Sequence, residues 1–111
     1  MTPENLLLAL TSIFPSFQAE WETENPYIHE DGSFTFHSVF LEFTDFFGVQ
    51  AAKSSTKQLL ATATIINDAV SDKSDLENAV STCFLEHLHQ IKAVKYLRPY
   101  LNERALAEVR A

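Results

Sequence analysis

Cys83 and His87 come nearest to a reactive pair in this chain, because they lie four residues apart in a segment with helical periodicity. Side chains at that spacing share one helix face, where a thiol and an imidazole can bind zinc or act as nucleophile and base. Glu86 and His89 add two ligand types but project from other faces. Because a zinc site needs three or four ligands, we predict a packed thiol beside a half-buried histidine, no metal site and no cofactor. A metal-dependent or thiol-dependent enzyme is the alternative.

Other reactive groups are no better organised. His29 and His37 flank Glu30 and Asp31, which allows an acid–base cluster, but nothing in the sequence sets their geometry. The motifs GxGxxG, GxSxG and HExxH and the P-loop are all missing from the sequence. We therefore predict a protein that is not an enzyme and has no catalytic residues.

Acidic residues alternate with large aromatic residues between positions 20 and 31, and this pattern is typical of a binding surface. Interfaces use aromatic side chains as anchors, while opposite charge raises the association rate and selects partners. The alternative is that the acids only keep the surface solvated and that the aromatics, above all Trp21, belong to the core. The predicted partner-binding residues are Glu20, Trp21, Glu22, Glu24, Tyr27, Glu30 and Asp31.

Charge is divided unevenly along the chain. The net charge is −7, and no Lys or Arg precedes Lys53. Residues 1–52 therefore carry −8 and residues 53–111 carry +1. A negative field of this kind repels phosphate backbones and anionic lipids and attracts basic proteins. We predict a basic protein partner, with no nucleic-acid and no membrane binding.

Composition indicates one helical domain over residues 1–111. The chain is 46% hydrophobic with nine Phe, which is enough for a core, and it has only two Gly and four Pro for tight turns. No apolar run approaches the roughly 18 residues of a membrane span, and the N-terminus lacks the basic region of a signal peptide. A lone cysteine, Cys83, cannot form an internal disulfide. We expect a soluble, cytoplasmic, all-α protein.

The fold prediction is a small bundle of about five helices with one acidic loop near residues 24–33. Expected N-caps are Thr2, Ser33 or Thr35, Ser54 or Ser55, Ser74 and Asn102. A short hairpin across Asp31-Gly32 is an alternative to the loop. The expected helical segments are 3–14, a short element ending near 24, one ending at Gly48, one ending before a turn at 71–73, 74–97 and 102–110.

The segment 74–97 is predicted to be one long buried helix around which the others pack. Ser74 and Glu77 have the spacing of a capping box, and Pro99 disfavours helix at the residue before it. Apolar residues recur at steps of three and four between these signals, which is the spacing of one helical face.

Within this segment, residues 75–88 (DLENAVSTCFLEHL) resemble a family of small uncharacterised bacterial helical proteins. Some members are encoded near toxin systems and are suspected of being immunity proteins. The likeness covers at most residues 70–101 and consists mainly of the runs ENA at 77–79, ST at 81–82 and FLE at 84–86. It implies no catalytic or binding residue.

Together these patterns favour a non-enzymatic, bacterial protein-binding module, with neutralisation of a basic toxin through the acidic N-terminal half as the more specific hypothesis. Besides the enzyme based on Cys83 and His87, a self-associating structural protein is left open, because the surplus of Phe could form a homo-oligomeric interface.

Overall fold

The computed structural model describes residues 1–23, 25–88 and 93–109. These residues form seven α-helices and three short 3₁₀-helices, with no β-strand among them, so the all-α prediction is confirmed. The α-helices are α1 (Pro3–Ile13), α2 (Phe17–Glu22), α3 (Phe36–Gln50), α4 (Thr56–Ala69), α5 (Asp75–Cys83), α6 (Val94–Leu97) and α7 (Glu103–Glu108). The 3₁₀-helices are η1 (Ala51–Lys53), η2 (Leu85–His87) and η3 (Arg98–Tyr100).

Five helices begin where a side chain can accept a hydrogen bond from the first turn, and Ser74 provides the cap for α5. Thr2 accepts from the Asn5 N–H at 3.1 Å, and Asn102 accepts from Ala105 at 2.8 Å. The other two caps are Thr35, rather than Ser33, and Ser55, rather than Ser54. Each cap satisfies a backbone N–H that has no partner inside its helix. These starts were therefore predictable from the sequence.

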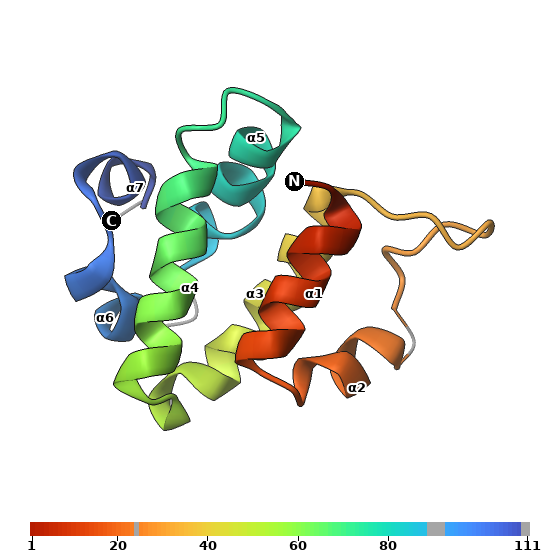
Figure 1. The fold of residues 1–111 in the computed structure, drawn as a ribbon, viewed down its shortest axis with the longest axis horizontal. Helices are drawn as coiled ribbons and strands as arrows, with labels where there is room; N and C mark the ends of the chain where they lie inside the picture. The colour runs from red at the N-terminus through yellow and green to blue at the C-terminus, as the bar shows by residue number, and fades with distance from the viewer. Residues whose placement is uncertain (24, 89–92, 110–111) are drawn as a thin grey trace.

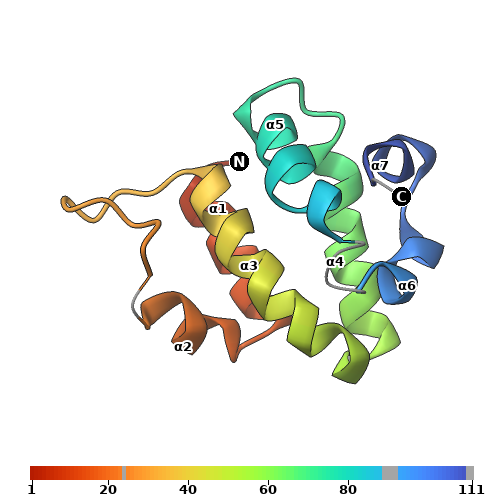
Figure 2. The ribbon, with the colours of Figure 1, turned by 180° about the vertical axis from the view of Figure 1, so that it is seen from behind.

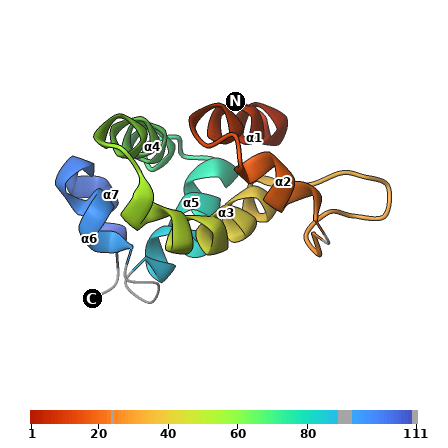
Figure 3. The ribbon, with the colours of Figure 1, turned by 90° about the horizontal axis from the view of Figure 1, so that it is seen from below.

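The helices form two layers, which Figure 3 shows from the side. Helices α1 and α4 lie next to each other in one layer, and α3 and α5 pack against each other in the layer below. Helix α2 packs on α3, while α6 and α7 lie along α4 at the opposite edge (Figure 1). Helices α1 and α2 and the loop at residues 25–35 thus lie on one side of the molecule (Figure 2), whereas α3 continues into η1, which contacts α6.

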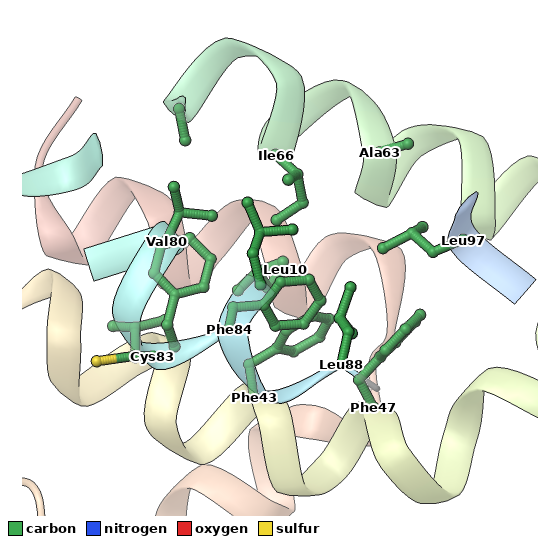
Figure 4. Close-up of a cluster of buried hydrophobic side chains, with 14 of the residues drawn as sticks. Leu10, Phe43, Phe47, Ala63, Ile66, Val80, Cys83, Phe84, Leu88 and Leu97 are labelled. Carbon is green, nitrogen blue, oxygen red and sulfur yellow. The ribbon is translucent and has the colours of Figure 1, made fainter. Parts of the chain in front are cut away.

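The core between the layers is built around phenylalanines of α3. The Phe43 ring lies 5.3 Å from Phe17 and 5.7 Å from Phe84, measured between ring centroids. Leu10 comes from α1 and Ile66 from α4, and both point into the same cluster (Figure 4). The stripe of Phe residues predicted on this helix is therefore core, because aromatic rings bury large apolar areas and pack edge to face.

The long helix predicted over 74–97 is wrong, because α5 ends at Cys83. Phe84 has non-helical backbone angles (φ −125°, ψ −66°), and the chain continues as the separate 3₁₀-helix η2. The Thr44 hydroxyl lies 2.6 Å from the Cys83 carbonyl oxygen and donates to it. In a continuous helix that carbonyl would accept from the N–H of His87, which instead bonds to the Phe84 carbonyl at 3.0 Å.

Burial of the Phe84 ring accompanies this break. The ring is fully buried among Phe40, Phe43 and Phe47 of α3. Tertiary packing has therefore overridden a regular helical spacing. Residues 89–92 of the predicted helix lie outside the described residues.

Three further details differ from the predictions. Ser74 caps α5 by accepting from the Leu76 N–H, while Glu77 does not close a capping box and instead pairs with Arg104 at 2.6 Å. Helix α3 continues through Gly48 to Gln50, because a glycine within a helix lowers its stability only modestly. No strand flanks Asp31-Gly32, so the alternative of a hairpin there is wrong.

Candidate partner-binding surface

The loop at residues 25–35 is held by short-range hydrogen bonds. The Asn25 side chain donates to the Trp21 carbonyl at 3.2 Å and accepts from the Tyr27 N–H at 2.9 Å. The Ser38 hydroxyl donates to the Tyr27 carbonyl at 2.9 Å, which anchors the loop to the start of α3. Gly32, with φ of +86°, occupies a left-handed position that glycine adopts at little cost. The loop therefore has a defined shape on the acidic side of the molecule.

Glu30 and Asp31 are exposed in this loop. The Asp31 carboxylate accepts from the hydroxyl of Ser33 at 2.6 Å and from its N–H at 2.9 Å. These hydrogen bonds, together with the nearby charge of His29, hold the pKa of Asp31 below its ordinary value. Asp31 is therefore stabilised as an anion in the folded protein.

Trp21 does not lie on the binding surface that the sequence pattern suggested. Its side chain is only 5% exposed, and its ring packs 4.9 Å from Phe34 and 6.4 Å from Phe17. The core alternative is the one that the structure supports for this residue. Trp21 thus packs α2 against Phe34 at the end of the loop.

The other predicted residues fall into two groups. Glu20 and Glu22 are exposed on α2, whereas Glu30 and Asp31 are exposed in the loop. Tyr27, which lies between the two groups in the sequence, is half-buried, and Glu24 lies outside the described residues. The loop extends away from α2 (Figure 1), so the acids do not form a single cluster.

Glu20 borders a shallow groove between α2 and α3, which we call the α2–α3 groove. Its volume is about 270 Å³. Most of its lining is apolar, and Val49 on its rim is 71% exposed although it is a large aliphatic side chain. The residues that line the groove are Ser16, Ala19, Glu20, Thr23, Phe46, Val49 and Gln50.

Two further acids, Glu42 and Asp45, lie on α3 close to Glu20. Partial burial, with the negative charges of Asp45 and Glu20 added to it, raises the pKa of Glu42 above its ordinary value. The prediction of partner-binding residues missed both. The signal was present, because Asp45, Phe46 and Val49 lie three, four and seven residues after Glu42 and therefore share one side of α3 with it.

A family model described as a domain of unknown function (DUF7674) matches residues 7–110. The chain belongs to this family. The resemblance to a family of uncharacterised proteins is thereby confirmed, and it extends far beyond the segment 70–101. Comparison with curated proteins and with solved structures found no match.

In this DUF7674 domain, Cys83 and His87 do not share a continuous helix. Cys83 ends α5, and His87 follows the break at Phe84 in η2. The Cys83 thiol is 7% exposed, and burial raises its pKa, with the nearby charge of Glu86 acting in the same direction. Since a thiolate is the nucleophile and the zinc ligand, this environment disfavours both chemistries.

The other metal-binding residue types are scattered over the described part of the DUF7674 domain. In the part of the chain that the structure describes, no group of three or more His, Cys, Asp or Glu side chains could hold a metal ion. His37 contacts Asn78 at 3.0 Å, on the side of α3 that faces α5, and His29 lies in the loop. Among the same residues, no helix is long and apolar enough to cross a bilayer.

Proposed function

We propose that this DUF7674 domain is a non-enzymatic binding module whose acidic N-terminal half engages a basic protein partner. The observation that carries the proposal is an acidic side whose described carboxylates form no ion pair with Lys or Arg. Residues 1–52 contribute eight carboxylates and no Lys or Arg. Within residues 1–23, 25–88 and 93–109, the one Lys or Arg ion pair joins Arg104 to Glu77, and neither belongs to this side.

Electrostatics explain why such a side favours a basic partner. Burial raises the pKa of Glu42, and the like charges of Asp45 and Glu20 add to this, so part of the shift reflects repulsion between neighbouring carboxylates in the folded protein. A partner that brings Lys or Arg side chains relieves this repulsion and is drawn to the surface from a distance. An electrostatic contact of this kind weakens as salt screens the charges, with a Debye length of about 8 Å at physiological ionic strength.

The more specific proposal is that the partner is a bacterial toxin and that the domain is its cytoplasmic immunity protein. The support is the resemblance of residues 75–88 to helical proteins suspected of that role, together with the charge. A basic nuclease needs positive residues to hold its substrate, so an acidic protein that covers them would block it. This step is an analogy from charge and size, since fold and family do not specify function.

The test uses the product of the gene beside this one as the candidate partner, co-expressed and then measured at several salt concentrations. The triple variant Glu20→Gln, Glu30→Gln, Asp31→Asn removes three charges from the acidic side. We expect on the order of tenfold weaker binding at low salt and a smaller salt dependence.

The matched control removes three charges from the other side, as Asp68→Asn, Glu103→Gln, Glu108→Gln. This variant should bind like the unmodified protein. Equal binding by all three proteins, with the same salt dependence, would contradict the proposed surface. Failure of the neighbouring gene product to bind at all would instead contradict its assignment as the partner.

A further inference from the structure

The α2–α3 groove combines an apolar surface with a local excess of negative charge. Ala19 of α2 and Thr23, the residue after α2, line it together with Phe46 and Val49 of α3. Phe46 is almost buried, with its ring 5.1 Å from Phe17, so the floor of the groove is part of the core and is rigid. Val49, in contrast, leaves most of its side chain in water.

The size of the groove limits what it can hold. At about 270 Å³, it falls below the usual range of about 300 to 1,000 Å³ for pockets that enclose a drug-sized ligand. Its walls come from the two packed helices α2 and α3, so a protein segment laid across these helices could place a side chain in it. One large aliphatic side chain would cover Val49 and Phe46 and remove their apolar surface from water.

The charge around the groove indicates which charged residues the bound segment should carry. Glu20 lies in the groove wall, and Glu42 and Asp45 continue the same side of α3. Among the described residues that line the groove there is no Lys or Arg. An acidic or neutral segment would leave these carboxylates unpaired and partly desolvated, whereas Lys or Arg beside the aliphatic side chain would pair with them.

Two other grooves on the described surface lack this combination. The groove beside Leu8, between α1 and α2, has Glu4 as its one acidic lining residue. The groove between α1 and α4 is lined by Ser12, Ile13, Lys57, Gln58 and Ala61 and contains a cation. Both expose apolar surface. The groove beside Leu8 has one acidic lining residue, as the α2–α3 groove does, but the carboxylate whose pKa neighbouring acids help to raise, Glu42, lies beside the α2–α3 groove.

We propose that the α2–α3 groove is the docking site for a basic segment of the partner, which inserts one aliphatic side chain between Ala19, Phe46 and Val49. Lysine or arginine residues on either side of it pair with Glu20, Glu42 and Asp45. The inference rests on the proposed function and locates it: the groove provides selectivity, and the loop acids Glu30 and Asp31 contribute long-range attraction.

The experiment titrates the full isotope-labelled chain with a synthetic amphipathic peptide of lysine and leucine, about 18 residues long so that it can form a helix. Amide chemical shifts map the contact, and their concentration dependence measures affinity. Two further peptides separate the contributions: one has glutamate in place of lysine, and the other has serine in place of leucine. Light scattering records the oligomeric state throughout.

Variants of exposed residues isolate the groove. Val49→Ser should weaken binding on the order of tenfold, the usual effect of losing one buried aliphatic contact. The matched control Leu8→Ser removes another exposed aliphatic side chain, 66% exposed, and should leave affinity unchanged. Glu42→Gln with Asp45→Asn should weaken binding by about fivefold at low salt, more than Glu30→Gln with Asp31→Asn does.

Each outcome has a defined consequence. Shift changes centred on Ala19 and Val49, with the expected order of variants, support the groove. Alternatively, the lysine peptide binds in a salt-dependent way with an affinity that neither Val49→Ser nor the α3 charge variant changes. That result contradicts the groove as the docking site but agrees with a binding surface of acidic residues. Equal binding of the glutamate peptide, or no binding of the lysine peptide, overturns both. A dimer that Val49→Ser converts to a monomer shows that the groove binds a second copy instead.

Discussion

Helix α3 and the chain from Ser74 to Leu97 bury side chains in the same phenylalanine cluster, but they reach it differently. Helix α3 runs unbroken for 15 residues and lines the cluster with Phe40, Phe43 and Phe47. The second segment leaves helical geometry at Phe84, which places that one ring between the three others. The helix with the most contacts in the cluster keeps its geometry, and the segment packed against it adapts.

Thr44 connects the two regions. Its buried hydroxyl lies 2.7 Å from the Phe40 carbonyl of its own helix and 2.6 Å from the Cys83 carbonyl at the end of α5. Helix α5 is thus held at its last residue by α3, which explains why the two elements pack together. The predictions that follow test this dependence, starting with the largest expected effect.

Replacing the ring at the centre of the cluster should be the most damaging change. Phe43→Ala leaves a cavity that the neighbouring rings can fill only in part. We therefore expect a loss of about 3 to 5 kcal/mol of unfolding free energy. Urea denaturation followed by circular dichroism measures it. The control is Phe36→Ala, a half-buried ring in the first turn of the same helix, which should cost about 1 kcal/mol. Similar losses of unfolding free energy in both variants would show that Phe43 contributes no more to stability than Phe36.

Thr44→Val keeps the shape of the side chain but removes the donor to Cys83. We expect a loss of about 1 to 3 kcal/mol, because a buried carbonyl is left without its partner. Thr62→Val is the matched control, since the Thr62 hydroxyl is also fully buried and bonds to the carbonyl four residues earlier, at 2.8 Å. That carbonyl belongs to the same helix as Thr62, so losing this hydrogen bond should reduce the unfolding free energy by less than Thr44→Val does.

Hydrogen exchange would show whether Thr44 also maintains the break. In Thr44→Val, slower exchange of the His87 amide would indicate that the helix extends past Phe84 once the carbonyl of Cys83 is released. Unchanged exchange there, with an equal stability loss in Thr62→Val, would assign the break to burial of the Phe84 ring alone.

The ion pair between Glu77 and Arg104 should contribute much less. Both side chains are partly exposed, and exposed pairs are usually worth about 0.2 to 1 kcal/mol. A double-mutant cycle with Glu77→Gln and Arg104→Lys should give a coupling energy in that range, which falls as salt is added. No coupling at low salt would indicate that Glu77 acts within its own helix after all.

The smallest effect, and one of opposite sign, is expected at Glu42. Its pKa is raised by partial burial and by Asp45 and Glu20, so the folded protein holds its proton more tightly than the unfolded chain does. Stability is therefore lost as pH rises from the ordinary value of 4.5 through the raised one. Glu42→Gln should stabilise the protein by up to about 0.5 kcal/mol at pH 7, and the gain should vanish well below pH 4.5.

Thermal denaturation of both proteins across this pH range measures the difference. Asp75→Asn is the contrasting variant, because Asp75 lies at the N-terminus of α5, where a negative charge is favourable. It should destabilise the protein at pH 7. A gain from both substitutions would mean that net charge, rather than the local setting of Glu42, controls the effect.

Of the candidate surface, the sequence predicted the charge but not its arrangement. The absence of Lys and Arg before Lys53 was visible at once, and so was the exposure expected of Glu20, Glu30 and Asp31. Glu42 and Asp45 are not among the predicted partner-binding residues, because the Phe stripe of α3 indicates only which side of that helix is buried. Their proximity to Glu20 depends on how α2 packs on α3, a contact between elements that periodicity alone does not specify.

The sequence by itself determined the helical class, the caps at Thr2, Ser74 and Asn102, and the negative charge of the first half. These properties depend on local hydrogen bonds, periodicity and composition, which a chain carries without reference to its fold. Only the tertiary structure decided that the segment 74–97 breaks at Phe84, that Trp21 is buried, and that a groove forms beside Val49. Each of these depends on side chains distant in sequence, whose packing energies exceed the small local preference for continuing a helix.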